Sequence, residues 1–210
     1  MKKIKNKEII LLFTVVVFCV SVAFKKNTVP ENYVTHYKEQ LKEFTKSQLQ
    51  LYSVIEKSQL SSPEEIEQIR GQINLTRDRL KGMDFWFRYL EPISYKQING
   101  PLPVEWETEV FEKFEAPYKR EGAGLTLSAL YLDEEQINKG VLLGLIKSSV
   151  TASAVYAADS ITKELNTADH FYLCNRLFLL NLAAIYTTGF ECPDTSRIIP
   201  ELEVMLTATY

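Results

Sequence analysis

The sequence predicts an all-α protein, an antiparallel helical bundle that follows an N-terminal signal peptide. Glycine and proline number eight each in 210 residues, so turns are scarce and long helices are favoured over many short strands. Apolar residues recur three or four positions apart over long stretches, which is the spacing of one helix face. The composition, 46% hydrophobic and 24% charged, excludes a disordered chain and a multi-span membrane protein, and the length fits one domain.

The first 24 residues have the layout of a signal peptide. Four lysines precede an apolar run from Ile9 to Phe24, which is shorter than the roughly 20 residues that span a bilayer as a helix. Small residues on both sides of Val22 suit cleavage after Ala23. We therefore expect secretion into the periplasm. A retained membrane anchor and a lipoprotein modified at Cys19 are the less favoured alternatives.

Residues 25–210 are expected to form one helical module with an excess of acidic residues. Removing residues 1–24 takes away four lysines and one glutamate, which changes the net charge from −3 to −6. This charge does not favour binding to nucleic acid. Contact with a membrane is expected through the signal segment alone, if that segment is not cleaved.

The first two helices should pair as an antiparallel hairpin. Residues 33–55 carry one apolar face, with lysine, glutamate and glutamine between the apolar positions. The second helix has Ser62 as its N-cap and Glu65 in the capping-box position, and it should continue until Pro92 stops it. Each helix would bury its apolar stripe against the other.

A long connection rich in proline and glycine is expected over residues 92–125. A short helix from Pro103 to Phe114 is predicted inside it. Its acidic residues could form a cation site or an acid/base pair, but a solvated helix face is the favoured interpretation. These acidic residues are Glu105, Glu107, Glu109, Glu112 and Glu115.

Three further helices are expected in the second half of the chain. Residues 133–136 should cap the first, and the second, which starts near 166–169, is apolar nearly all round and is therefore placed at the centre of the bundle. Residues 193–196 should cap the last helix. No stop signal precedes Tyr210, which suggests a module truncated at its C-terminus.

No catalytic, cofactor-binding or metal-binding residue is predicted on this chain. His36 and His170 lack partners at metal-ligand spacings and are interpreted as structural, His170 with a capping role beside Asp169. The aromatic run Asp84–Tyr89 could dock a planar cofactor or a partner, but core packing is the commoner use of such a stripe.

The two cysteines of the mature part are predicted to be buried free thiols. A mostly helical chain between Cys174 and Cys192 would hold their Cα atoms roughly 25 Å apart, far beyond the reach of a disulfide. Neither begins a Cys-x-x-Cys-His motif, so covalent c-type haem is not expected on this chain. The sequence also contains no Gly-x-Ser-x-Gly elbow and no glycine-rich phosphate loop.

Two stretches of the sequence carry a family resemblance. The first is FWFRYLEP at 85–92 with YKQINGPLPVE at 95–105, and the second is DHFYLCNRL at 169–177 with TGFECP at 188–193. Over about residues 30–210 the chain resembles the N-terminal helical region of bacterial di-haem cytochrome c peroxidases. This extension is similar in architecture to imelysin-type helical bundles.

The resemblance implies a function for the whole protein rather than for this chain. Members of the family reduce hydrogen peroxide to water with electrons from a small cytochrome c, and they use two c-type haems on a C-terminal portion. The implied partners are that haem-containing portion and the small cytochrome c. This chain lacks the haem attachments, so it is predicted to be inactive alone. The alternative is a free-standing exported imelysin-like helical binding module without catalysis.

Overall fold

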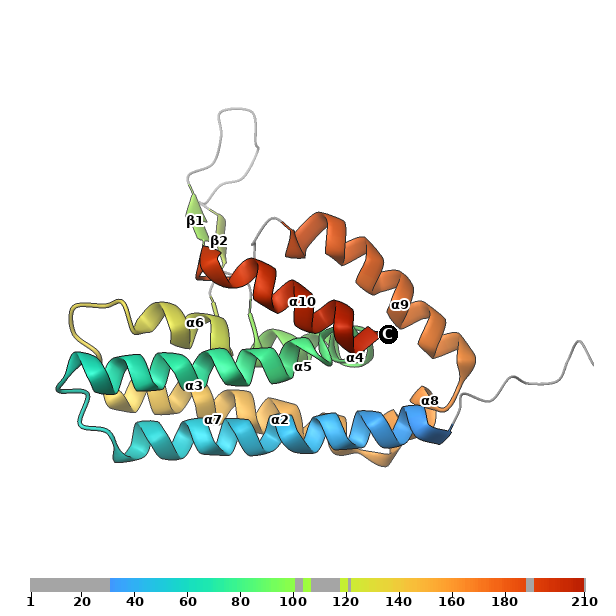
Figure 1. Cartoon of the computed structure of the whole chain (residues 1–210), viewed down its shortest axis with the longest axis horizontal. Helices are drawn as coiled ribbons and strands as arrows, with labels where there is room; N and C mark the ends of the chain where they lie inside the picture. Colours follow the sequence, from blue (N-terminus) through green and yellow to red (C-terminus); the bar gives the residue numbers. More distant parts are fainter. Residues whose placement is uncertain (1–30, 101–103, 107–117, 121, 188–190, 210) are drawn as a thin grey trace, which may run out of the picture.

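A computed structural model describes residues 31–100, 104–106, 118–120, 122–187 and 191–209. The predicted signal peptide, residues 1–24, lies outside these residues. The described chain is predominantly helical (Figure 1), so the all-α class is confirmed. One short two-stranded ribbon is an addition that the sequence did not predict.

The helices are α2 (Glu31–Lys57), α3 (Pro63–Lys81), α4 (Asp84–Leu90), α5 (Pro92–Ile98), α6 (Gly124–Tyr131), α7 (Lys139–Ser153), α8 (Asp159–Leu165), α9 (Ala168–Asn181) and α10 (Ile198–Thr209). Turns of 3₁₀ helix follow α7 at Ala154–Ala157 and precede α10 at Thr195–Arg197, and a π-helical turn at Leu182–Tyr186 extends α9. The strands are β1 (Val104–Trp106) and β2 (Tyr118–Arg120).

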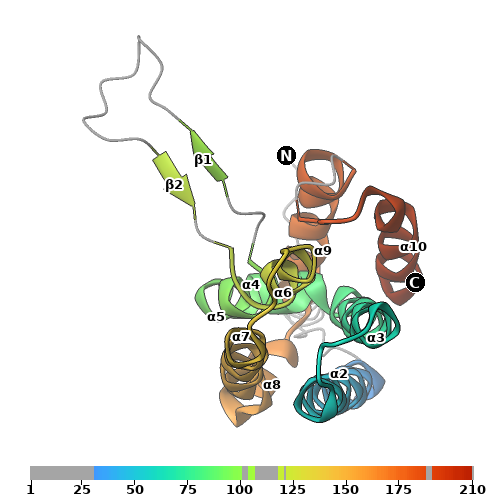
Figure 2. The ribbon, with the colours of Figure 1, turned by 90° about the vertical axis from the view of Figure 1, so that its left-hand side faces the viewer.

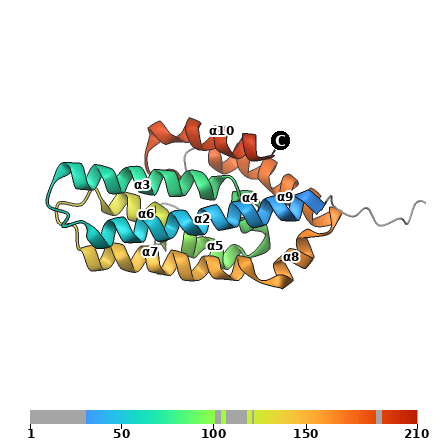
Figure 3. The same ribbon diagram turned by 60° about the horizontal axis from the view of Figure 1, so that its bottom comes forward.

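The long helices α2, α3 and α7 lie side by side (Figures 1 and 3). A short connection joins α2 to α3, and α7 packs against α2, α5 and α6. The Lys139 ammonium, at the start of α7, donates to the carbonyls of Glu56 at 2.6 Å and Ser58 at 2.7 Å. A cation at this position satisfies carbonyls that the end of α2 leaves without helical partners.

The segment Lys139–Ala157 is long and apolar enough to cross a membrane, by length and composition. It comprises α7 and the 3₁₀ turn that follows. Its contacts with α2, α5 and α6 make it one side of the helical core.

The capping residues explain where two of these helices begin. As predicted, Ser62 caps α3: its hydroxyl accepts from the Glu65 amide at 3.2 Å, and the Glu65 carboxylate accepts from the Ser61 amide at 2.9 Å. The predicted cap of α7 at residues 133–136 is wrong. Asn138 caps this helix instead, because its side-chain oxygen accepts from the Gly140 amide at 2.9 Å.

The second predicted helix is not continuous up to Pro92. It ends at Lys81, and α4 starts after a two-residue break at 82–83. Pro92 does not simply stop a helix, since it is the first residue of α5, where its missing N–H costs nothing. The break lets α4 enter the core, so that its first four residues, Asp84–Phe87, are all buried.

Aromatic rings of α4 form the centre of the hydrophobic core. Phe87 stacks on Tyr156 with ring centroids 3.8 Å apart, and Trp86 meets Tyr37 edge to face at 5.4 Å. Core packing of the run Asp84–Tyr89 is therefore confirmed for its first four residues. The expectation that α9 occupies the centre is wrong, because α4 takes that place and several apolar side chains of α9 are exposed.

The ribbon replaces part of the short helix predicted from Pro103 to Phe114. β1 pairs antiparallel with β2, with Glu105 opposite Lys119 and Trp106 opposite Tyr118. Figure 2 shows the ribbon projecting away from the helices. The other acidic residues of that predicted helix, at positions 107–115, lie outside the described residues.

Gly124 and Gly71 give a matched test of this backbone. Gly124 has a φ of +56°, and a Cβ there would lie 2.0 Å from the Ile98 carbonyl oxygen, whereas a Cβ at Gly71 in α3 meets nothing within 4 Å. We expect Gly124→Ala to lower the free energy of unfolding by more than about 2 kcal/mol, and Gly71→Ala to raise it by about 0.5–1 kcal/mol. Urea unfolding measures both. Equal effects of the two substitutions would contradict the packing described.

Candidate functional site

Six ionisable side chains converge on the buried centre of the protein. Three are basic and three are acidic, so their formal charges cancel. They are Arg77 and Lys81 on α3, Asp84 and Arg88 on α4, Glu191 before the last helix, and Glu201 on α10. We call this set the ion network.

Arg77 ties several elements together through its guanidinium group, which is 1% exposed. It binds the Glu201 carboxylate with two nitrogens, at 2.7 and 3.0 Å. It also donates to the side-chain oxygens of Asn99 at 2.8 Å and Thr126 at 3.1 Å, and to the Glu191 carbonyl at 2.9 Å. One side chain therefore connects α3 with the end of α5, with α6, and with α10.

Asp84 is the most enclosed acid of the ion network. Its carboxylate accepts hydrogen bonds from the hydroxyls of Tyr95 and Tyr186 and lies 3.3 Å from Arg88 and 4.0 Å from Lys81. Burial raises the pKa of Asp84, but the two cations and the two hydroxyls outweigh burial and lower the pKa to about 2. Asp84 is thus an ionised carboxylate at neutral pH.

Lys81 lies among all three acids. Its ammonium is 4.0 Å from Asp84, 3.9 Å from Glu191 and 4.0 Å from Glu201. Arg88 donates to Glu191 at 2.9 Å, so each of the six charges has an opposite charge beside it. Such pairing is expected, because burying an ion without an opposite charge beside it costs a large free energy.

The tyrosines of the ion network act as hydrogen-bond donors, and the two cavities described beside it are small. Burial raises the pKa of both Tyr95 and Tyr186 above the ordinary value, so both hydroxyls stay protonated and serve as donors to Asp84. Among the described residues, one cavity beside Arg77 has a volume of about 30 Å³ and one beside Lys81 has a volume of about 10 Å³. Such spaces admit a water molecule but no substrate.

The π-helical turn Leu182–Tyr186 supplies one of these donors. It carries Tyr186 into the core, where its ring lies 5.2 Å from the Lys81 ammonium and its hydroxyl reaches Asp84. π-helical turns are rare and occur often where a side chain needs a special placement. No local sequence pattern signals this turn.

The two histidines lie on different helices and contact different rings of α4. His36 is exposed on α2, with its ring centroid 6.1 Å from that of Trp86. His170 lies in the first turn of α9, with its ring 5.6 Å from Tyr89. The side chain that caps α9 is Thr167, and His170 contributes its amide as the donor. Among the described residues, no group of histidine, cysteine and acidic side chains is arranged to hold a metal ion.

Cys174 and Cys192 are both free and buried, as predicted. Burial raises the pKa of the Cys174 thiol to about 12. At neutral pH this residue is therefore a thiol rather than a reactive thiolate.

Sequence reasoning missed the basic residues of α3 that build the ion network. Arg77 lies four residues after the buried Ile73, and Lys81 lies four residues after Arg77, so both continue the apolar stripe. A charged residue in a buried stripe is the signal that could have pointed to a partner elsewhere. The partner itself, Glu201, is 124 positions away and has no local signature.

A second feature is an apolar surface on α9, which we call the α9 face. Tyr172 and Leu179 are 67% and 63% exposed, and Leu173 and Leu180 are 44% and 60% exposed. Each pair is seven residues apart, so all four side chains lie on one side of the helix. Large apolar side chains grouped in this way mark interaction surfaces.

Comparison of the chain with protein-family models, with curated proteins and with solved structures finds no match. Its function is therefore argued from the geometry above and from the sequence.

The lowered pKa of Asp84 predicts how stability depends on pH. The pKa of Asp84 is about 2 in the folded protein, below the ordinary value of 3.8. The ionised carboxylate therefore contributes fully to the free energy of unfolding at pH values above 3.8. This contribution is lost as the pH falls through about 2. This loss amounts to about 2 kcal/mol. Urea unfolding between pH 5 and 2 should show a steeper decline for the wild type than for Asp84→Asn, which cannot titrate. Parallel declines would refute this assignment.

Proposed function

We propose that this chain is a non-catalytic docking module, the N-terminal helical part of an exported protein of the di-haem cytochrome c peroxidase type. The observation that carries the proposal is the α9 face. The sequence of α9 is apolar nearly all round, so its surface is expected to be buried against a partner. Four of its large side chains are exposed in the described structure. The haem-containing C-terminal portion is the proposed partner.

The positions of the two resembling stretches support this assignment. Arg88 belongs to the first stretch and Glu191 to the second, and the two side chains meet at 2.9 Å in the ion network. Tyr95 and Asn99, also in the first stretch, join the same network. Both resembling stretches therefore contribute residues to the contacts that hold the fold together, as expected for a shared scaffold.

The wider proposal follows from the same family. Residues 1–24 direct export to the periplasm, and the rest of the chain is an antiparallel helical bundle. The family reaction, reduction of hydrogen peroxide by electrons from a small cytochrome c, belongs to two c-type haems on the C-terminal portion. This chain would hold and orient that portion through its surface. The charges at its own centre are paired with one another.

A second candidate function is a free-standing exported imelysin-like helical binding module. A groove of about 700 Å³ beside α2 favours this alternative, because its volume is that of a small-molecule site. In this case the α9 face would contact another protein, and no haem would be attached to the gene product.

The reading frame beyond codon 210 distinguishes the two candidates. The docking proposal predicts a continuation with two Cys-x-x-Cys-His motifs and a purified product with c-type haem absorption bands. A stop codon directly after Tyr210 with a colourless product would favour the binding module. A longer frame without a haem-attachment motif would contradict the docking proposal.

Substitutions on the α9 face test docking directly. Leu179→Glu with Leu180→Glu should weaken binding of the chain to the separately purified haem portion at least tenfold, because both side chains would be buried on docking. The matched control is Leu75→Glu with Ile93→Glu, two exposed positions on other helices. Analytical ultracentrifugation measures the affinity of each double variant for the haem portion. Equal weakening by the two double variants would show that the α9 face is not the docking surface.

A further inference from the structure

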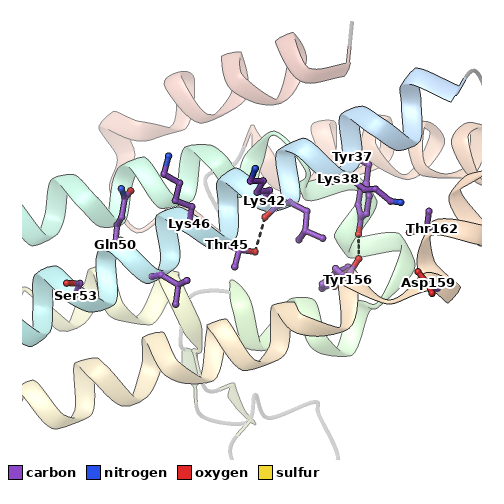
Figure 4. A pocket seen from close by; sticks show the side chains of 13 residues that line it. Tyr37, Lys38, Lys42, Thr45, Lys46, Gln50, Ser53, Tyr156, Asp159 and Thr162 are labelled. Carbon is purple, nitrogen blue, oxygen red and sulfur yellow. Dashed lines mark hydrogen bonds between the residues drawn. The ribbon is translucent and has the colours of Figure 1, made fainter.

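A groove runs along α2 on the side that faces the turn Ala154–Ala157 and the start of α8 (Figure 4). Its volume is about 700 Å³. The side chains that line it extend from Tyr37 to Ser53 on α2 and include Tyr156, Asp159 and Thr162 on the opposite wall. The groove lies apart from the ion network and from the α9 face.

Three hydroxyl groups of the lining are engaged in hydrogen bonds within the protein, which leaves apolar surface around them. The Tyr37 hydroxyl donates to the Tyr156 carbonyl at 2.9 Å, and the Tyr156 hydroxyl donates to the Glu91 carbonyl at 2.7 Å. The Thr45 hydroxyl donates a hydrogen bond to the Leu41 carbonyl at 2.8 Å. Leu41 lies between these groups, and the floor suits a ligand that makes apolar contacts and needs no hydrogen bonds.

The rim of the groove is positively charged. Lys38, Lys42 and Lys46 follow one another at four-residue intervals along α2, and all three are exposed. Like charges at this spacing repel each other and disfavour the helix unless an anion lies beside them. Within the described chain, no ion pair joins Lys38 or Lys42, and Lys46 has a weak surface pair with Glu43 at 3.9 Å.

The dimensions of the groove select an extended occupant. From Tyr37 to Ser53 the helix rises about 24 Å, so a volume of about 700 Å³ gives a mean width of roughly 6 Å. An α-helix with its side chains is about 10–12 Å wide, so only one face of it could enter the groove. An acyl chain is narrow enough to lie along the groove over its whole width.

We propose that this groove binds a free long-chain fatty carboxylate. The acyl chain lies along Leu41 and Leu49, and the carboxylate faces Lys42 and Lys46. Figure 4 places Asp159, the acidic side chain in the lining, near Tyr156, at the end of the groove away from Lys46. Leu49 is 54% exposed, which leaves apolar surface for the chain to cover. This inference does not depend on the haem portion proposed above.

Isothermal titration calorimetry of the full chain with sodium decanoate and dodecanoate, below their micelle concentrations, tests the proposal. Saturable binding should tighten roughly fourfold for each added methylene group and weaken with rising salt. Dodecanol, which lacks the charge, should bind at least fivefold more weakly than dodecanoate. Absence of saturable binding to the wild type would overturn the proposal.

Matched variants locate the binding. Lys42→Glu with Lys46→Glu should weaken dodecanoate binding at least tenfold, whereas Lys57→Glu, on the same helix and outside the lining, should not change it. These lysines are exposed, so folding is expected to persist and circular dichroism checks it. The apolar run at 9–24 is the same in every variant and cancels in the comparison. Equal affinities of the two charge variants would overturn the proposal.

The apolar half of the site has its own test. Leu49→Asp should weaken dodecanoate binding at least tenfold, and Leu75→Asp, a similarly exposed leucine on α3, should leave it unchanged. A final experiment measures cosedimentation of the protein with vesicles of phosphatidylglycerol, which present acyl chains within a membrane. Cosedimentation with the vesicles without binding of monomeric dodecanoate would assign the groove to a membrane surface and overturn the proposal.

Discussion

The pairing of buried charges is the constraint on which this structure depends. Removing an ion from water costs several kcal/mol even after the protein relaxes, so a buried charge is tolerated only beside an opposite charge in good geometry. Arg77 meets this condition by binding both oxygens of Glu201, and Lys81 meets it by lying among three acids. Because these residues come from α3, α4 and α10, we infer that the network fixes how the helices assemble.

Local patterns in the sequence predicted what local physics decides. The start of α3 at Ser62, the burial of Phe85–Phe87 and the free thiols of Cys174 and Cys192 all follow from neighbours in the chain. The break before Asp84 and the exposure of α9 could not be predicted in this way. Both depend on which helix packs against which, and the ion network joins residues more than 100 positions apart.

The described surface carries two features besides the ion network, the apolar side chains on α9 and the groove beside α2. Within the network the charges are matched and the tyrosines stay protonated, and the two cavities described beside it have room for water alone.

A double-mutant cycle on Arg77 and Glu201 tests the central claim most directly. Arg77→Met and Glu201→Leu should each lower the free energy of unfolding by about 3–5 kcal/mol, because each leaves its partner buried and unpaired. The double variant should lose less than the sum by at least about 2 kcal/mol. The exposed pair Arg70 and Asp133, 2.8 Å apart, is the control and should couple by less than about 1 kcal/mol. Small, additive losses at Arg77 and Glu201 would contradict the account.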